Sequence, residues 1–446
     1  RLFSLSFVVL TAIMALAIVF APWIVRLYTL RDFPGRSIER ETATFFLRWF
    51  MPQIVFYGLG AIAGGLLNAH RRFAAPMFAP IANNLIVTAT FVLYAAMPGP
   101  AAGSRALATG AQELVLAIGT TFGVAGMTIA LWPAVRSIGF RFRWRGGFRH
   151  PAVVRLGRLA RWVIVYVVAN QLGYLVIPVL ATPVRGGYTA YLAAFILFQL
   201  PHAIFAVSIF TALLPAMSSR WAAGDAAGFR SLLSTGIRAT AAILLPAAFG
   251  YITIGHEIVR LLLQHGIATA ASGRLVASIL AFFAIGLFPF SLFQLLLRAF
   301  YAMQDTRTPA LINIVSVGVN TGANLLYFFG FGLGVRGLAL GHATAYTFAS
   351  ITSLVLLRRR LGGLEGRRTW PRVLRSLVAA AATGATAWLV ARGVGAIVDA
   401  TTVGGAALQV FVAIGAGVLV FVGVALILRI EEVDTVWRQV RARLRR

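Results

Sequence analysis

This 446-residue chain has long apolar stretches, and Arg48, Arg238 and Arg298 lie within them. A charged side chain at the centre of a membrane-spanning helix costs about 2.5–3.5 kcal/mol on insertion scales, so such a residue is a functional candidate by default. The planar guanidinium group also forms forked hydrogen bonds with phosphate oxygens. We therefore take Arg238, Arg48 and Arg298 as candidate substrate-binding residues. The alternative for each is an arginine whose head group reaches back to the membrane surface.

Amide side chains lie in the same apolar stretches, and five of them join the arginines as candidate substrate-binding residues. These five are Asn83, Asn84, Gln53, Asn170 and Gln199, while Gln171, Asn313, Asn320 and Asn324 have similar settings. Hydrogen bonding between helices, worth only about 0.6 kcal/mol on average in membranes, is the commoner use of such groups. His202 and His342 have side chains that titrate near neutral pH and would couple to protons, with a structural hydrogen bond as the alternative.

Several kinds of chemistry are excluded by what the sequence lacks. It has no cysteine, which rules out disulfides and thiolate metal sites. All 40 basic residues are arginine, so no lysine exists to complete a nucleotide-binding Gly-Lys-Ser/Thr loop. Neither a His-Glu-x-x-His sequence nor a nucleophile elbow occurs. We therefore expect no catalytic residue, no metal site and no cofactor, in a protein that is not an enzyme.

The composition places the candidate residues in a membrane. Hydrophobic residues make up 59% of the chain and charged residues 12%, against about 45–50% and roughly 25% in soluble domains. A bilayer core needs about 20 mostly apolar residues per helix. We predict an all-α polytopic membrane protein with twelve transmembrane helices, at approximately 3–25, 44–67, 76–97, 113–135, 160–181, 188–215, 234–254, 275–299, 309–331, 336–357, 373–396 and 404–429.

The net charge of +28 is concentrated in the loops between these stretches. One alternate set of loops, with the C-terminal tail, holds 26 arginines, and the opposite set holds 10. Such a bias places the richer set in the cytoplasm. The pattern favours contact with anionic membrane lipids over nucleic acid. We expect a multi-pass protein of the bacterial plasma (inner) membrane with a cytoplasmic C-terminus.

A large module occurs twice in the chain. Three matches, in the same order and at similar offsets, join Ile24–Leu27 with Ile258–Leu261, Asn68–Pro76 with Tyr301–Pro309, and Leu116–Thr120 with Leu338–His342. Matched stretches cross in one direction, which is typical of parallel-repeat transporters with two lobes. The second copy is preceded by two apolar stretches that the first lacks. We therefore expect an N-terminal lobe over 1–150 that is two helices short, a six-helix lobe over 151–360, and two helices with a basic tail over 361–446.

Six short motifs, in order along the chain, resemble the MurJ/MviN family of lipid II flippases, part of the multidrug/oligosaccharidyl-lipid/polysaccharide exporter superfamily. They are Ala21–Val25, Leu66–Asn68 through Arg72–Phe73 to Pro76, Ala79–Pro80 with Asn83–Asn84, Leu200–His202, Thr211–Pro215, and Phe300–Tyr301 through Gln304–Asp305 to Thr308–Pro309.

The resemblance implies a carrier that flips lipid II, a lipid-linked peptidoglycan precursor, from the cytoplasmic to the periplasmic leaflet by alternating access. It implies a cationic cavity between the lobes, a groove for the undecaprenyl tail at the last two helices, and energy from the membrane potential or an ion gradient. The partners it implies are lipid II or a related undecaprenyl-diphosphate lipid, anionic lipids and proteins of cell-wall synthesis.

The chain also departs from the family. The family's first two helices, which carry its most characteristic arginines, have no counterpart in this sequence. Phe195 and Ile196 stand where Gram-negative members carry an acidic–basic pair. These departures keep two alternatives open. One is another carrier of the same superfamily, for a different lipid-linked polysaccharide or for drugs, and the other is a cell-wall scaffold that transports nothing.

Overall fold

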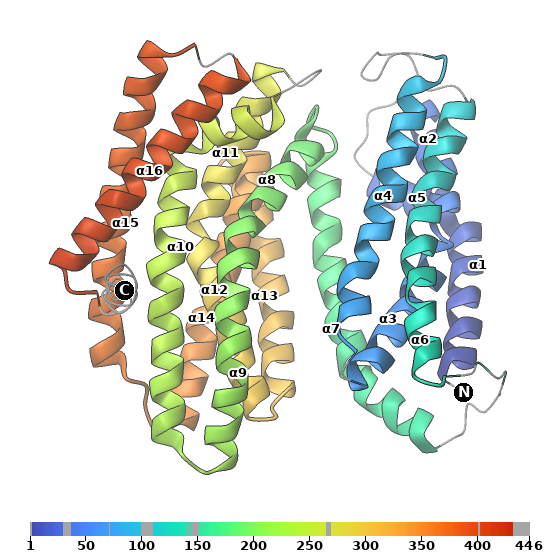
Figure 1. Cartoon of the computed structure of the whole chain (residues 1–446), viewed down its shortest axis with the longest axis horizontal. Helices are drawn as coiled ribbons and strands as arrows, with labels where there is room; N and C mark the ends of the chain where they lie inside the picture. The colour runs from blue at the N-terminus through green and yellow to red at the C-terminus, as the bar shows by residue number, and fades with distance from the viewer. Residues whose placement is uncertain are drawn as a thin grey trace. The chain divides into compact units, whose positions relative to one another are not determined.

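The computed structural model describes residues 2–29, 37–70, 72–99, 110–140, 142, 144, 151–264, 269–399 and 402–430 (Figure 1). Throughout these residues the regular elements are helices, and the chain divides into two compact units, Arg1–Arg161 and Trp162–Arg446. Each unit is described by itself. The three-part division at 150 and 360 stays a prediction.

The first unit contains six helices and the beginning of a seventh. They are α1 (Leu2–Tyr28), α2 (Ser37–Phe50), α3 (Gln53–Ala69), α4 (Ala74–Ala96), α5 (Gly110–Ala130), α6 (Trp132–Ser137) and α7 (Pro151–Ala181). Within the unit, α1 contacts α2 and α3, and α4 packs along α5. A small apolar core that includes Leu67 and Val135 lies at the end of α3 and in α6.

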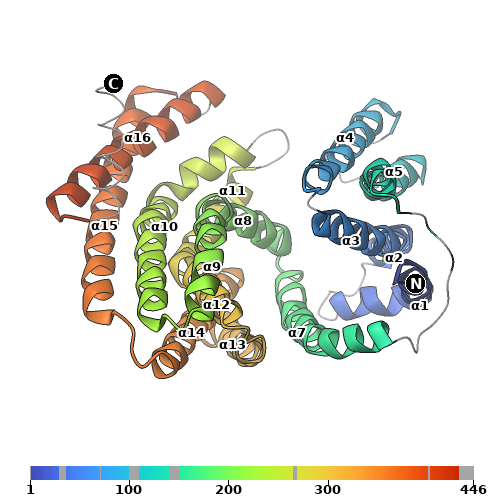
Figure 2. The same ribbon diagram turned by 60° about the horizontal axis from the view of Figure 1, so that its bottom comes forward.

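The second unit contains the rest of α7 and, in the described residues, all the later helices. They are α8 (Gly187–Pro201), η1 (His202–Ala206), α9 (Val207–Ala222), α10 (Ala226–Leu263), α11 (Ala270–Ile285), α12 (Leu287–Ala302), α13 (Arg307–Leu325), η2 (Leu326–Gly330), α14 (Val335–Arg360), α15 (Gly366–Ile397) and α16 (Val403–Ile427). The central core gathers Tyr191, Phe198, Phe283 and Phe300, all nearly inaccessible. α15 packs against both α10 and α16. α15 and α16 lie to one side of this unit, next to α10 (Figure 2).

The helices are those of a multi-pass membrane protein. In the described residues, ten helices are long and apolar enough to cross a bilayer, or eleven if the bent pair α11 and α12 forms one span. The expected number of twelve is therefore not confirmed. The span predicted at 160–181 lies in α7, whose described apolar part, Val167–Ala181, is shorter than a full span. Large apolar side chains cover the outside, as at Leu419 and Ile427, which are 75% and 80% exposed.

Both units contain the same interrupted helix. In the first unit the break at Met51–Pro52 separates α2 from α3, and in the second Gly286 separates α11 from α12. Pro52 and Gly286 are as far apart in the chain as Ile24 and Ile258, which begin the first sequence match. Proline has no N–H for the helical ladder, and glycine is the weakest helix former after proline, so two different residues interrupt the equivalent span.

The turn after the interrupted helix also has the same backbone hydrogen bonds in both units. The N–H of Arg72 donates to the carbonyl of Leu67 at 2.8 Å, and the N–H of Asp305 donates to that of Phe300 at 3.0 Å. Such a bond across five residues is the mark of a Schellman-type helix end, which needs one residue in the left-handed region. Gln304 fills that place in the second unit, with φ 58°.

A hydroxyl group ties each interrupted helix to the last long helix of its repeat. Thr128 of α5 donates to the carbonyl of Phe56 at 2.9 Å, and Ser350 of α14 donates to that of Pro289 at 2.7 Å. Each acceptor lies in the first turn after the break. Thr128 and Ser350 are as far apart in the chain as Leu116 and Leu338, which begin the third sequence match. Phe56 and Pro289 are as far apart as Asn68 and Tyr301, which begin the second. The repeated module therefore has a repeated internal structure.

Candidate functional site

An arginine-lined groove of about 690 Å³ lies between the end of α1 and α2. Arg26, Arg40 and Arg48 line it together with one acid, Glu41. Arg40 donates from Nε to the hydroxyl of Thr29 at 3.1 Å and from Nη2 to its carbonyl at 3.0 Å. Arg26 stacks over Trp23, 5.3 Å from the ring centroid. The groove therefore has a net positive charge beside aromatic side chains.

Arg48 is the arginine of this groove with an accessible head group. Its side chain is exposed, and no described residue accepts a hydrogen bond from it. It lies in the last turn of α2, one turn before the break at Pro52. Arg40 holds α1 and α2 together, whereas Arg48 is available to an anion. The prediction for Arg48 as a ligand residue is compatible with this position and stays a prediction.

The amide candidates of the first unit lie at helix contacts. Gln53 donates to the hydroxyl of Thr121 at 3.2 Å, and that hydroxyl donates to the carbonyl of Trp49 at 2.8 Å. Asn83 packs against Gly123 of α5, where an added Cβ would lie 2.6 Å from its Oδ1. Asn84 is exposed. The arrangement of Gln53 matches the structural alternative, a hydrogen bond between helices.

A polar pocket of about 130 Å³ lies in the second unit between α7, α8, α13 and α14. Its volume exceeds the roughly 10–15 Å³ that one water needs. Among its lining residues are Asn170, Asn313, Asn320 and His342, which the sequence analysis had considered one by one. Within the described residues, Asn313 Nδ2 and His342 Nδ1 are buried without a hydrogen-bond partner. The pocket therefore has polar groups ready for water or a ligand.

Phe195, one of the residues at the family's charged pair, lines the same pocket. Its ring stacks against Tyr191 at 6.3 Å and meets His342 edge-on at 5.7 Å between centroids. An aromatic cluster thus occupies the side of the pocket that Phe195 forms, in line with the expected replacement of the charged pair by apolar residues. Ile196, by contrast, is 62% exposed.

Arg238 lies in the contact between α10 and α15. It is 7% exposed, and it donates to the hydroxyl of Ser234 at 3.0 Å and to that of Thr235 at 3.3 Å. The Ser234 hydroxyl also hydrogen-bonds with Thr369 of α15 at 2.6 Å. The side chain therefore neither lines one of the grooves described here nor reaches out to the surface in this structure.

The last two candidates lie apart from the polar pocket. Arg298 is exposed near the end of α12, and Gln199 is partly buried near the end of α8. Next to Gln199, the ring nitrogen Nδ1 of His202 hydrogen-bonds with Ser291 at 2.8 Å. His202 thus has the structural hydrogen bond that was its alternative role.

An apolar groove of about 440 Å³ runs along α10, α15 and α16. Pro201, Phe205, Gly250, Gly417 and Phe421 are among its lining residues, and most of the others are aliphatic. The resemblance implied such a groove at the last two helices without naming residues. The sequence signal for this groove was the set of small residues on these helices. Small side chains leave space between the helix surfaces.

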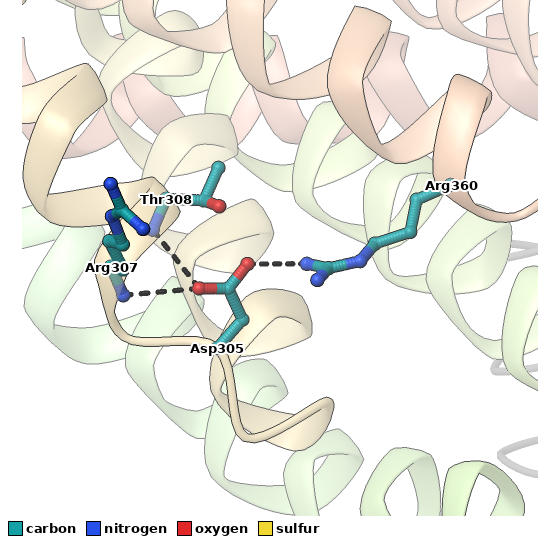
Figure 3. Close-up of polar contacts among 4 residues, drawn as sticks. All are labelled: Asp305, Arg307, Thr308 and Arg360. Atoms are coloured by element: carbon teal, nitrogen blue, oxygen red, sulfur yellow. Dashed lines mark hydrogen bonds and ion pairs between the residues drawn. The ribbon is translucent and has the colours of Figure 1, made fainter.

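Asp305 forms a polar cluster that sequence reasoning missed (Figure 3). Its Oδ1 accepts from the backbone N–H groups of Arg307 at 3.1 Å and Thr308 at 3.0 Å, and its Oδ2 pairs with Arg360 of α14. Burial would raise the pKa of Asp305, but the hydrogen bonds from Thr308 and Arg360 outweigh it and hold the pKa below its usual value. The carboxylate both caps α13 and connects it to α14.

We expect Asp305→Asn to destabilise the purified protein by up to about 1 kcal/mol, since the amide still caps the helix but loses the partly exposed ion pair. Asp305→Ala loses both and should be less stable again. A lowered folded pKa means that the charge contributes its stability above the unfolded value of about 3.9 and loses it as the pH falls further. Thermal unfolding in detergent should show a constant difference from wild type between pH 7 and 5 that shrinks below pH 4. A difference that grows on acidification would contradict this account.

Comparison with known proteins places the chain in a family. A family model described as "Lipid II flippase MurJ" matches residues 1–398. The chain belongs to the MurJ family. A "Probable lipid II flippase MurJ" of Rickettsia prowazekii (strain Madrid E) is 26% identical over 73% of this chain and 62% of its own length. The protein of the same description from Rhizobium meliloti (strain 1021) is 29% identical over 65% and 52%.

Solved structures show the same fold. The structure titled "Lipid II flippase MurJ, inward closed conformation" matches 96% of this chain and 83% of that chain, with a TM-score of 0.75 at 18% identity. An inward-facing multidrug resistance MATE transporter of the MOP superfamily matches 80% and 79%, with a TM-score of 0.62 at 14% identity. The chain spans 62% and 52% of the two MurJ-family relatives compared above. The activity of a whole MurJ protein is therefore a proposal for this chain.

Proposed function

We propose that this chain flips lipid II, or a related undecaprenyl-diphosphate lipid, across the bacterial inner membrane. The observation that carries the proposal is the presence, in a MurJ-family chain, of grooves suited to both ends of such a lipid. The groove with Arg26, Arg40 and Arg48 suits an anionic head group. The groove with Gly250 and Gly417 suits a long apolar chain.

The remaining expectations complete the proposal. Transport proceeds from the cytoplasmic to the periplasmic leaflet by alternating access, driven by the membrane potential or an ion gradient, and without catalysis. The C-terminus faces the cytoplasm, anionic lipids contact the arginine-rich loops, and proteins of cell-wall synthesis are partners. The excess of arginine in one set of loops supports this orientation.

The experiment for this function is rescue of a bacterial strain depleted of its own lipid II flippase. Expression from the complete gene should restore growth and normal cell shape. Membrane expression is measured in parallel, so that a failure to accumulate is distinguished from a failure to transport. Good accumulation without rescue would reject lipid II as the cargo.

A second function is favoured by one observation. Phe195 lines the polar pocket where the family's Gram-negative members carry a charge, so the contacts available to a cargo differ there. This observation favours another carrier of the same superfamily, for a different lipid-linked polysaccharide or a drug. Rescue of a teichoic-acid or polysaccharide pathway, with none for peptidoglycan, would select this alternative. Rescue of neither pathway by a well-expressed protein would favour the non-transporting scaffold.

For lipid II, we expect Arg48→Gln to weaken binding about tenfold or more, because a hydrogen bond to a charged group contributes roughly 1.5–3 kcal/mol. Binding is measured by titrating purified protein with lipid II and counting the bound lipid by native mass spectrometry. Thermal stability should be unchanged, since the Arg48 side chain is exposed. Arg40→Gln, in contrast, should lower thermal stability, because Arg40 holds α1 to α2 through its hydrogen bonds with Thr29. Unchanged lipid II binding by Arg48→Gln would remove this residue from the site.

A further inference from the structure

A second basic pocket, in the other unit, is not used by the proposed transport. It has a volume of about 720 Å³ and lies where α14 ends and α15 begins. Its lining includes Leu354, Val355, Arg358, Glu365, Arg367 and Trp370. The two helices are joined by a tight turn in which Gly362 and Gly363 have φ of 67° and 135°, values that favour glycine. The turn brings arginines from both helices to one pocket.

The positive charge of this pocket favours the binding of an anion. Arg358, Arg367 and Arg368 line it with a single acid, Glu365, so positive charge is in excess. Arg358 and Arg367 are exposed, while Arg368 also takes part in other interactions within the described residues. Like charges gathered around one pocket repel each other, and a bound anion relieves that repulsion. The planar guanidinium is suited to the oxygens of a phosphate group.

The other lining residues indicate that this anion is part of a lipid. Leu354 and Val355 belong to α14 and Trp370 to α15, and both helices meet the criteria for a membrane span. Val355 is 44% exposed and Trp370 is 50% exposed, so an apolar surface continues from the pocket onto the outside of the span. Tryptophan is enriched at the level of lipid headgroups. The pocket therefore lies at the membrane–water interface and has one basic side and one apolar side.

We propose that this pocket binds the phosphodiester headgroup of an anionic glycerophospholipid. Arg358 and Arg367 contact the phosphate, Trp370 lies at the glycerol level, and an acyl chain runs along Leu354 and Val355. The site is separate from both grooves assigned to lipid II. It is a discrete binding site, in addition to the general attraction between the basic loops and the membrane, and it does not depend on the proposed transport.

The test is native mass spectrometry of the full chain, titrated with phosphatidylglycerol and, in parallel, with phosphatidylcholine. Arg358→Gln/Arg367→Gln removes one exposed arginine from each helix at the pocket. We expect one high-affinity phosphatidylglycerol molecule on the wild type and none of comparable affinity for phosphatidylcholine. An arginine near a membrane surface is worth about a fivefold change in affinity, so the double variant should bind about 25-fold more weakly.

The matched control is Arg336→Gln/Arg392→Gln, which removes one arginine from the opposite end of each of the same two helices. Arg392 even has its own tryptophan, stacking 4.0 Å over Trp388. The control should retain the wild-type affinity for phosphatidylglycerol. The single variant Arg367→Gln, with an expected loss of about fivefold, serves if the double variant accumulates poorly.

Three results would overturn the proposal. Equal losses in the pocket variant and the control would show that only overall charge matters. Displacement of phosphatidylglycerol by millimolar inorganic phosphate would show a site for free phosphate. Competition between phosphatidylglycerol and lipid II would show a shared site. None of these results depends on whether the chain rescues a flippase-depleted strain, so failure of this proposal is distinct from failure of the proposed function.

Discussion

Replacing Gly250 with phenylalanine is expected to abolish rescue of a flippase-depleted strain while leaving the protein folded in the membrane. Gly250 lines the apolar groove, and a Cβ built there meets no other atom within 4 Å. The aromatic ring would therefore fill space reserved for the prenyl chain instead of colliding with a helix. Each methylene group that loses its apolar contact costs about 0.8 kcal/mol, so displacing four of them weakens binding about 200-fold.

The control for this variant is Gly415→Phe on α16. Gly415 is exposed outside the groove, and a Cβ there also meets nothing within 4 Å. It should rescue as the wild type does, which separates loss of the groove from the mere addition of bulk. Membrane accumulation and thermal stability are measured for both variants. Normal rescue by Gly250→Phe would mean that the groove does not hold the lipid chain.

The second large effect is expected from Gly286→Ala, which should destabilise the second unit by about 1–3 kcal/mol, as overpacking of a dense core does. A Cβ at Gly286 would lie 2.7 Å from the Cα of Ala343. Because that neighbour is backbone and not the end of a flexible side chain, the whole of α14 would have to move. We expect a lower unfolding temperature and less monodisperse protein on size-exclusion chromatography.

Gly318→Ala in α13 is the matched substitution without a collision. Gly318 is exposed, and its added Cβ meets nothing within 4 Å. Alanine is about 0.5–1 kcal/mol better than glycine inside a helix, so this variant should be as stable as the wild type or slightly more stable. If Gly286→Ala proved as stable as Gly318→Ala, the close approach of α12 to α14 would not be a feature of the folded protein.

The fold class could be predicted because each spanning helix carries its own signal. A run of apolar residues as long as the one in α16 is recognisable without knowledge of any other part of the chain. The number of spans was harder to predict, since α11 and α12 form either two short helices or one bent span. The lack of room for a side chain at Gly286 comes from the close approach of Ala343, which belongs to a later helix and cannot be recognised in local sequence.

The candidate sites were predicted less well, for the same reason. Asn170 and His342 were recognised singly, but their meeting in one pocket depends on how α7 and α14 pack. Arg238 has an ordinary sequence context, and its burial beside Ser234, which hydrogen-bonds with Thr369 of α15, became visible only in the folded chain. Asp305 and Arg360 form an ion pair between separate helices, which no spacing rule anticipates. The type of each residue therefore predicted the interactions that it could make. Which residues share a site could be known only from the tertiary structure.

The two interrupted helices differ in one respect that bears on motion. α2 and α3 continue as one span, Arg40–Ala69, whereas α11 and α12 are bent by 48°. In the first unit Thr128 of α5 anchors the segment after the break, and in the second unit Ser350 of α14 does so. The same joint thus occurs twice in one polypeptide, with a different bend in each copy. Because the hydroxyl anchor lies on the segment after the break in both copies, a change of bend is compatible with an unchanged anchor.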